Sequence, residues 1–448
     1  MNLFIISLFI IIEYSINEII INFKKNSLLN TNNNDEESLF KNIITNDMII
    51  NIQVGSQKQE IPISLKLQEY CTYLLSPNLT TTLPTFDSNS SSTFKKLSER
   101  PFLSAVEDYK RSFKVEDNFC LNNKEEINEF KFILAAELRE GNSVRNGGAL
   151  GLQIDSPFTV LLCNDTNIIQ QLKDKQFINS FGFFFNFDKD LNKGGQLVLG
   201  AYPHESSLFK NNKLYREKNV KTKKIHQINY AFNWGLYFDK IKFGDNFDEH
   251  NKHCSLMPEL NGLIAINKYK NYITEVLKED INKKNCIENE IEMFQENYTY
   301  LICDKNVKFN NIKNLEFYVT EFDYTFKINI NDLIYEKDNK KYLLILFPEK
   351  DNNWVLGLPF YKNIGVVSYD LYRKTIGFYI SNNMNNESGS GSNFILFFLA
   401  VILLSLIIYI LFYLKKKIKK RNAQELFDTI DSQYEQFDIN KNKLTTNN

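Results

Sequence analysis

The sequence predicts a large β-stranded region that is followed by one transmembrane helix. Apolar residues alternate within residues 50–54 and again within 61–67, with Gly55 between the two runs. This pattern predicts a β-hairpin with one buried face. A continuous apolar stretch at residues 394–414 predicts the helix. The chain has 448 residues, which is enough for two or three domains.

The composition is that of a folded protein with a sizeable core, since 43% of the residues are hydrophobic. The net charge of -1 argues against a general nucleic-acid partner. His250, His253 and Cys254 are of types that bind metals, but no second ligand pair lies nearby. We interpret that stretch as a solvated loop, and we expect neither a metal site nor a cofactor.

The six cysteines all precede the predicted membrane helix. An even number on one side of a membrane indicates disulfides formed in an oxidising compartment, and free buried thiols are the alternative. They are Cys71, Cys120, Cys163, Cys254, Cys286 and Cys303.

Residues 1–20 are predicted to be a signal peptide. Their apolar run of about ten residues is too short to span a bilayer. No basic residue precedes the run and no clear cleavage motif follows it. Cleavage near Ser15 and an uncleaved anchor therefore both stay open.

The C-terminal end predicts a single-pass topology. Residues 394–414 cover a hydrocarbon core of about 30 Å at about 1.5 Å per residue. A cluster of Lys and Arg follows within residues 415–421, and a Gly/Ser linker precedes the helix at 383–393. The positive-inside rule makes 415–448 a cytoplasmic tail and places the larger, preceding region in a lumen or outside the cell.

Short motifs agree with this topology. In the tail, Tyr434 and Phe437 form the tyrosine-x-x-apolar pattern that sorting adaptors read, with a featureless tail as the alternative. Five Asn-x-Ser/Thr glycosylation sequons lie on the proposed luminal side, namely Asn78, Asn89, Asn164, Asn297 and Asn386.

Seven short segments follow one another between residues 48 and 380. They are 51–74, 86–94, 148–152, 181–200, 233–244, 354–360 and 366–378. In this order they resemble the pepsin-like aspartic proteases (peptidase A1). The resemblance implies an all-β, bilobal pepsin-like fold in which each lobe repeats one β-rich unit.

The resemblance also divides the chain. It implies an N-terminal lobe at 48–205, an inter-lobe segment at 206–225 and a C-terminal lobe at 226–382. Residues 21–47 are polar and are either a linker or a vestigial pro-segment. Residues 102–121 fall where the family has a glycine-rich flap, but they contain no glycine, so we expect a remodelled flap.

The family's two Asp-Thr/Ser-Gly motifs fall on residues 66–68 and 257–259, the second with an ambiguity of one residue. Lys66 and Met257 then take the places of the catalytic aspartates. Aspartic proteases need two carboxylates that share one proton. A lysine and a methionine cannot supply them, so we predict no catalytic residues.

Three functions stay open after this comparison. The first is a catalytically inactive homologue that binds a peptide or protein in its inter-lobe cleft. The second is an active membrane-anchored endopeptidase with a displaced dyad, for which Glu69 and Glu259 are the candidates. The third is a structural surface glycoprotein.

The resemblance implies a disulfide between Cys286 and Cys303. By order in the chain, Cys71 and Cys120 are a plausible pair in the first lobe. The two remaining cysteines would then pair across the lobes.

Overall fold

A computed structural model describes most of residues 17–380 and four residues beyond them. The described residues are 17–25, 36–79, 83–98, 109–122, 125–138, 146–154, 163, 165–188, 193–225, 227–228, 231–243, 248–294, 296–350, 353–380, Tyr413, Lys415, Leu426 and Ile430. The chain divides into two units, residues 1–380 and 381–448, and the first unit holds the fold.

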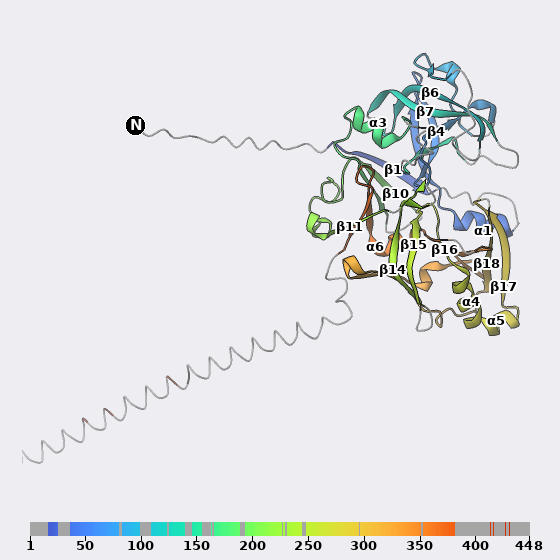
Figure 1. Ribbon diagram of the computed structural model, residues 1–448, viewed down its shortest axis with the longest axis vertical. Coiled ribbons are helices and arrows are strands. Elements are labelled where there is room, and N and C mark those ends of the chain that lie inside the picture. Colours follow the sequence, from blue (N-terminus) through green and yellow to red (C-terminus); the bar gives the residue numbers. More distant parts are fainter. Residues whose placement is uncertain are drawn as a thin grey trace, which may run out of the picture. The chain divides into compact units, whose positions relative to one another are not determined.

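The first unit is built on two large β-sheets (Figure 1). The first sheet has the strand order β11-β26-β25-β9-β10-β1-β2-β3-β8-β4-β7-β6-β5, so strands from both ends of the chain share it. Its strands are β1 (Ile19–Lys25), β2 (Met48–Val54), β3 (Gln59–Lys66), β4 (Tyr73–Leu75), β5 (Lys95–Lys96), β6 (Tyr109–Cys120), β7 (Glu126–Leu138), β8 (Gly148–Gly151), β9 (Gly182–Phe187), β10 (Gly195–Leu199), β11 (Val220–Lys224), β25 (Val366–Asp370) and β26 (Thr375–Tyr379).

The second sheet lies in the C-terminal lobe, in the order β20-β19-β14-β15-β24-β16-β23-β18-β22-β21, and β17 pairs with β18. Its strands are β14 (Gly235–Phe243), β15 (Asp248–Leu256), β16 (Leu263–Ile264), β17 (Cys286–Met293), β18 (Glu296–Asp304), β19 (Leu315–Val319), β20 (Tyr324–Ile328), β21 (Ile334–Lys337), β22 (Lys340–Leu343), β23 (Ile345–Pro348) and β24 (Trp354–Leu356). A small separate pair joins β12 (Gln227–Ile228) to β13 (Ala231–Phe232).

Helices are few and short in the described residues. They are α1 (Glu36–Ile44), α3 (Ile168–Asp174), α4 (Asn267–Val276), α5 (Lys278–Asn282) and α6 (Leu358–Ile364). The mostly β architecture agrees with the fold class that the sequence predicts.

The opening hairpin forms as predicted. The alternating residues Ile50, Ile52 and Val54 of β2 are all buried, and β2 pairs with β3 in antiparallel register. Gly55 turns the chain at a φ of 79°, and a Cβ there would lie 2.8 Å from Ser91 Oγ. Glycine therefore suits both the backbone angle and the space.

The two lobes repeat one strand pattern. In the N-terminal lobe β3 runs parallel to β8, β8 antiparallel to β4, and β4 parallel to β7. In the C-terminal lobe β15 runs parallel to β24, β24 antiparallel to β16, and β16 parallel to β23. In each lobe a loop leaves the first of these strands and crosses to the third. The expected internal repeat is thus present in the topology.

Residues 21–47 are not a simple linker, and that alternative is wrong for the parts described. Residues 19–25 form β1, which pairs with β10 and β2. The predicted signal peptide at 1–20 therefore overlaps the fold by two residues. Further along, α1 buries Phe40 against Tyr300, with ring centroids 3.7 Å apart. Apolar burial on the C-terminal lobe outweighs the polar character that suggested a linker.

The disulfides correct one predicted pair. Cys286–Cys303 is present and joins facing residues of β17 and β18. Cys71 pairs with Cys163 rather than with Cys120. Cys120 and the other remaining cysteine, which we expected to pair across the lobes, are free and buried. The prediction from cysteine order is wrong because Cys71 lies in the loop after β3, close to the segment before α3 that carries Cys163.

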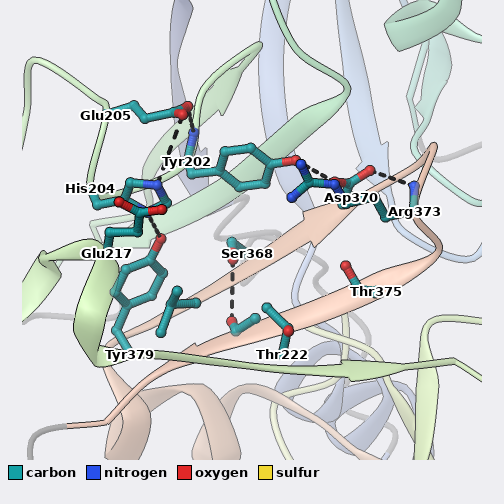
Figure 2. A pocket seen from close by; sticks show the side chains of 12 residues that line it. Tyr202, His204, Glu205, Glu217, Thr222, Ser368, Asp370, Arg373, Thr375 and Tyr379 are labelled. Carbon is teal, nitrogen blue, oxygen red and sulfur yellow. Dashed lines mark hydrogen bonds and ion pairs between the residues drawn. The ribbon is translucent and has the colours of Figure 1, made fainter.

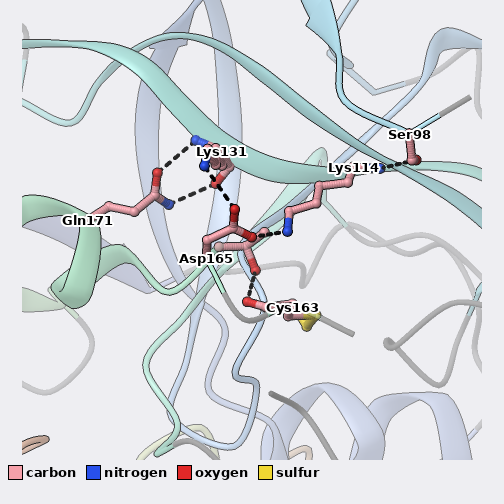
Figure 3. A network of polar contacts seen from close by, with 8 residues as sticks. Ser98, Lys114, Lys131, Cys163, Asp165 and Gln171 are labelled. Carbon is pink, nitrogen blue, oxygen red and sulfur yellow. Dashed lines mark hydrogen bonds and ion pairs between the residues drawn. A yellow bond between two sulfur atoms is a disulfide. The ribbon is translucent and has the colours of Figure 1, made fainter. Parts of the chain in front are cut away.

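An ionic network holds the segment that carries Cys163 (Figure 3). Asp165 accepts a hydrogen bond from Lys131 Nζ at 2.9 Å and forms a second ion pair with Lys114. Gln171 binds both backbone groups of Lys131 at 2.8 Å. Burial raises the pKa of the Asp165 carboxyl, but the two lysines outweigh it and lower the pKa below its usual range.

A second correction concerns the stretch that contains His250, His253 and Cys254. It is not a solvated loop but part of β15, which pairs with β14 on one side and with β24 on the other. His253 and Cys254 are buried. Local polarity gives no sign of the two neighbouring strands.

Several predictions lie outside the described residues. Residues 102–108 of the expected flap region and almost all of the predicted span at 394–414 belong to this group, as do Asn164, Asn386, Tyr434 and Phe437. Most of the rest of the flap region forms β6. Among the residues that are described, no helix is long and apolar enough to cross a membrane. Asn78, Asn89 and Asn297 are exposed.

Candidate functional site

The strand registers place Lys66 and Met257 at equivalent points of the two lobes. Lys66 ends β3 and lies opposite Gly151 of β8. The β15–β24 register, continued by one residue, sets Met257 beside Gly357. The repeated topology therefore removes the one-residue ambiguity of the sequence comparison. Both residues stand where a loop begins to cross between strands.

Both loops need the glycine that they cross. A Cβ on Gly151 would lie 2.6 Å from the carbonyl carbon of Tyr70 in the first loop. A Cβ on Gly357 would lie 2.2 Å from the carbonyl oxygen of Leu260 in the second. Contacts this short exclude any side chain, so the two loops have the same close backbone packing.

The two loops bind each other across the lobes, and we call residues 66–69 and 256–260 the loop junction. The backbone N–H of Leu67 donates to Oε1 of Glu259. The side-chain amide of Gln68 donates to the carbonyl oxygen of Leu256 at 2.8 Å. Glu259 is 3% exposed. Residues at the family's Thr-Gly positions thus connect the lobes.

Two charged groups lie close to Glu259 or to its neighbour in the loop junction, namely Lys66 and, beside Lys66, Asp47. Lys66 Nζ lies 3.6 Å from Oδ1 of the buried Asp47. Burial raises the pKa of the Glu259 carboxyl above its usual range, while Lys66 and the backbone amides of residues 67, 68 and 259 oppose the rise. The charged side chain that acts on Glu259 here is therefore an ammonium, not a second carboxylate.

Residues 49–379 match the family model described as eukaryotic aspartyl protease. The chain belongs to the eukaryotic aspartyl protease family. The match covers more than half of the 448 residues, and it includes the strands of the two sheets from β2 onward but not β1. A search of curated proteins found no match. The pepsin-like fold of this family has an inter-lobe cleft that binds peptides.

Of the two residues that we predict at the dyad positions of this aspartyl protease homologue, neither carries a carboxyl group. Lys66 is engaged with Asp47. Met257 packs at the edge of an apolar cluster that includes Phe40 and Leu260, and its thioether has no ionisable proton. A shared-proton pair needs like groups close together. Lys66 and Met257 are not such a pair.

For the alternative of a displaced dyad, formed by Glu69 and Glu259, the two side chains have different surroundings. Glu259 does lie in the loop junction, but its Oε1 is bound by the Leu67 amide. The backbone carbonyl of Glu69 accepts from the Gln153 amide at 2.8 Å, and its side chain is half-buried. In this structure Glu259 thus links the two loops.

Sequence reasoning missed a segment, residues 43–47, that runs beside the second loop. Asn46 donates from its backbone to Glu259 O at 2.7 Å and from its side chain to Pro258 O at 2.8 Å. Asn261 donates from its own side chain to the carbonyls of Ile43 and Thr45. The bonds from Asn46 occupy the carbonyl groups of Pro258 and Glu259 in the second loop. The spacing of three apolar residues in α1, preceded by two glutamates, is the signal that could have revealed this element.

A polar pocket of about 190 Å³ lies away from the loop junction, along β25 and β26 (Figure 2). Tyr202 donates to Asp370, whose carboxylate also accepts the Arg373 amide at 2.7 Å. His204 Nδ1 lies 2.6 Å from the Tyr379 hydroxyl. The polar groups that line this pocket largely hydrogen-bond with one another. We therefore interpret the pocket as a stabilising network and not as a ligand site.

Proposed function

We propose that this protein is a membrane-anchored pseudoprotease that acts by binding a peptide or protein. The observation that carries the proposal is the matched position of Lys66 and Met257 at the starts of the two crossing loops. The scaffold of a peptide-binding family is retained around them. In this proposal hydrolysis by the usual route is absent because Lys66 and Met257 cannot form a pair of carboxylates that shares a proton.

The residue types at positions 66 and 257 support the proposal that proteolytic activity is lost. In an aspartic protease one carboxylate acts as base toward water while the other acts as acid toward the substrate carbonyl. Lys66 brings an amine in place of a carboxyl, and this amine is paired with Asp47. Met257 brings no titratable group. The two residues therefore cannot form the pair of carboxyl groups that shares one proton.

In this proposal residues 36–47 are a vestigial pro-segment that stays in place. The stacking of Phe40 on Tyr300 and the hydrogen bonds of Asn46 support it. The segment covers part of the C-terminal lobe and leaves other surfaces to a ligand. A pro-segment is released to expose a catalytic centre, so an inactive homologue does not need to release it.

The membrane arrangement is also part of the proposal. Residues 1–20 direct secretion, 394–414 span the membrane and 415–448 form the cytoplasmic tail. The domain then lies in a lumen or outside the cell, where disulfides such as Cys286–Cys303 persist. The exposed positions of Asn78, Asn89 and Asn297 support glycosylation there.

The experiment that tests the proposal is peptide-library hydrolysis by the full-length protein in detergent, from pH 3 to 7. Wild type and a Lys66→Asp, Met257→Asp double variant are compared, each with and without a pepstatin-type inhibitor. We expect no cleavage by the wild type although it is folded. Cleavage that the inhibitor blocks would contradict the proposal and establish an active endopeptidase with an unseen dyad.

A second measurement separates a binding protein from a structural glycoprotein. Peptides that co-purify with the protein are released by acid and identified by mass spectrometry. A restricted peptide set supports binding. Absence of any retained peptide or protein at high yield would favour the structural glycoprotein.

A further inference from the structure

Two β-strands of the first unit have one side that no described strand covers (Figure 1). β11 ends the first sheet and pairs with β26 alone. β17 leaves the main path of the second sheet and pairs with β18 alone. The uncovered side of such a strand presents backbone N–H and C=O groups to which a further strand can add. We call these two sides the β11 edge and the β17 edge.

Alternate residues of β11 direct their backbone groups to the β11 edge. The backbone N–H of Ile380 donates to the carbonyl of Asn219 at 3.0 Å, in register with the pairing of β11 and β26. Residues of an antiparallel strand bond alternately to its two sides. Asn219 and every second residue after it therefore bond toward β26, whereas Thr222 and Lys224 point their N–H and C=O groups outward.

The β11 edge is positively charged. Lys221 and Lys224 are exposed, and neither forms an ion pair with any residue that the structure describes. Lys223, the third lysine of the strand, is paired with Asp239 at 4.0 Å. β11 contains no acidic residue. A second β11 edge would be repelled, so a strand that adds to this edge needs acidic side chains.

Alternate residues of β17 direct their backbone groups to the β17 edge in the same way. The backbone N–H of Asp304 donates to the carbonyl of Asn285 at 2.8 Å, in register with the pairing of β17 and β18. Asn285 and every second residue after it therefore bond toward β18. Glu288, Glu290 and Glu292 occupy the intervening positions, so their N–H and C=O groups point outward.

The β17 edge is negatively charged. Glu288, Glu290 and Glu292 are exposed, and their side chains lie on one face of the sheet because successive members are two residues apart. Glu288 is paired with Lys270 of α4 at 2.7 Å. Glu290 and Glu292 form no ion pair within the described part of the chain. β17 contains no basic residue, so a strand that adds to this edge needs basic side chains.

Apolar side chains are exposed near both ends of β17. Ile287 is 43% exposed and Phe294 is 47% exposed. A strand that covers the β17 edge can bury part of this apolar area, which adds to the attraction between charges. The sequon residue Asn297 lies in β18, on the paired side of β17, and therefore not on the β17 edge itself.

We propose that the β11 edge of one copy of this chain pairs in antiparallel orientation with the β17 edge of a second copy. The outward-bonding residues of the two edges then face each other, so Lys224 lies opposite a glutamate of β17. Directly opposite residues of paired strands have their side chains on the same face, where Lys and Glu attract each other. The inference depends neither on the membrane anchor nor on the loss of proteolysis.

The charges select a second copy that is joined through unlike edges. Two β11 edges repel each other, as do two β17 edges, whereas a β11 edge and a β17 edge attract. Because both edges belong to one chain, every copy supplies the partner for the next. The contact joins two different surfaces, so it is heterologous and can repeat from copy to copy. Two short strands form a small interface, and we therefore expect association that depends on concentration.

The first test is sedimentation velocity of the full-length protein in a non-ionic detergent at neutral pH, over a series of concentrations. The wild type should associate as its concentration rises. A β11 variant carries Lys221→Glu and Lys224→Glu, and a β17 variant carries Glu290→Lys and Glu292→Lys. Each variant alone should associate at least about ten-fold more weakly, because the first has two acidic edges and the second has two basic edges.

A mixture of the two variants separates edge pairing from other effects. In an equimolar mixture the acidic edges of the β11 variant meet the basic edges of the β17 variant, so association should return to near the wild-type strength. Neither misfolding of a variant nor a change in its total charge restores association in this way. A control variant with Lys308→Glu and Lys313→Glu changes two exposed lysines outside both edges and should associate as the wild type does.

The second test identifies the residues in contact. Unlabelled and isotopically heavy wild-type protein are mixed and treated with a carbodiimide, which joins an amine to a carboxylate that touches it. Cross-linked peptides are then identified by mass spectrometry. We expect links between light and heavy chains from Lys221 or Lys224 to Glu290 or Glu292, and fewer such links at high salt.

Three results would overturn the proposal. One is a wild type that sediments as a monomer at every concentration. Another is a mixture of the two variants that associates no more strongly than either variant alone. The third is a set of links between light and heavy chains that all join other parts of the chain. Restored association in the mixture, together with the expected links, would support the pairing of the two edges.

Discussion

Replacing Glu259 by Ala should destabilise the folded protein because it removes the acceptor of a buried amide. Leu67 and Glu259 are both almost fully buried, and the Leu67 N–H donates to the Glu259 carboxyl across the lobes. Leaving a buried donor without a partner costs about 1–3 kcal/mol. For a domain of this size, each kcal/mol lowers the thermal midpoint by about 2–4 °C. We therefore expect a fall of about 2–12 °C.

A Glu259→Gln variant adds a test of the pKa. Burial raises the pKa of the Glu259 carboxyl in the folded state above the usual value of 4.5. The folded protein thus binds this proton more tightly than the unfolded chain does. The stability that the protonated group contributes is fully present below pH 4.5 and is lost as the pH rises through the folded pKa. The glutamine of the variant cannot ionise, so the midpoint of the wild type relative to that of the variant should fall as the pH rises from 4.5.

The assay is thermal unfolding of the full-length protein in detergent. It is monitored by circular dichroism at a series of pH values from 4.5 upward. Glu279→Ala is the matched control, since its side chain is 90% exposed and surface changes stay within about 0.5 kcal/mol. An Ala variant as stable as the wild type would refute the linking role of Glu259. A wild type that gains stability over the Gln variant with rising pH would refute the direction of the pKa shift.

Two further predictions concern the elements that the sequence did not reveal. Phe40→Ala should lower stability by about 3–5 kcal/mol, because a fully buried ring stacked on Tyr300 is removed; an unchanged urea midpoint would show that α1 is not part of the fold. Peptide mapping without reduction should recover Cys71 linked to Cys163, and a Cys71–Cys120 peptide would contradict the structure. The bond closes a loop with a sequence separation of 92, so Cys163→Ser should cost about 2–5 kcal/mol in the same unfolding assay.

The parts of the fold that the sequence predicts are those set by local pattern. The hairpin of β2 and β3 alternates residue by residue because one face of it is buried, and that alternation is visible without any partner. Gly151 and Gly357 belong to two of the segments that resemble the family. Each is a glycine because the backbone of a neighbouring loop passes too close for a side chain. Such requirements restrict the residue type at one position, so they can be recognised in the sequence itself.

The parts that could not be predicted depend on partners far away in the chain. The helix α1 is polar on most of its surface and is ordered by Tyr300, which lies in the C-terminal lobe. The Cys71–Cys163 bond depends on which loop passes the end of β3. Glu259 reads as a solvent-facing loop residue, yet its role comes from Leu67 in the other lobe. Nothing within a short window around these residues specifies such contacts.

For the pseudoprotease that we propose, the loop junction also predicts that two restored aspartates would not be enough for catalysis. A Lys66→Asp change would remove the cation that now pairs with Asp47 and acts on Glu259. Three carboxyl groups would then meet in one largely buried place, and like charges there raise each other's pKa. The loop connection would still depend on the Glu259 side chain, at a position where the family has glycine. The loop junction is therefore stabilised by contacts that do not need a pair of catalytic aspartates, so the proposed loss of the reaction would leave the scaffold in place.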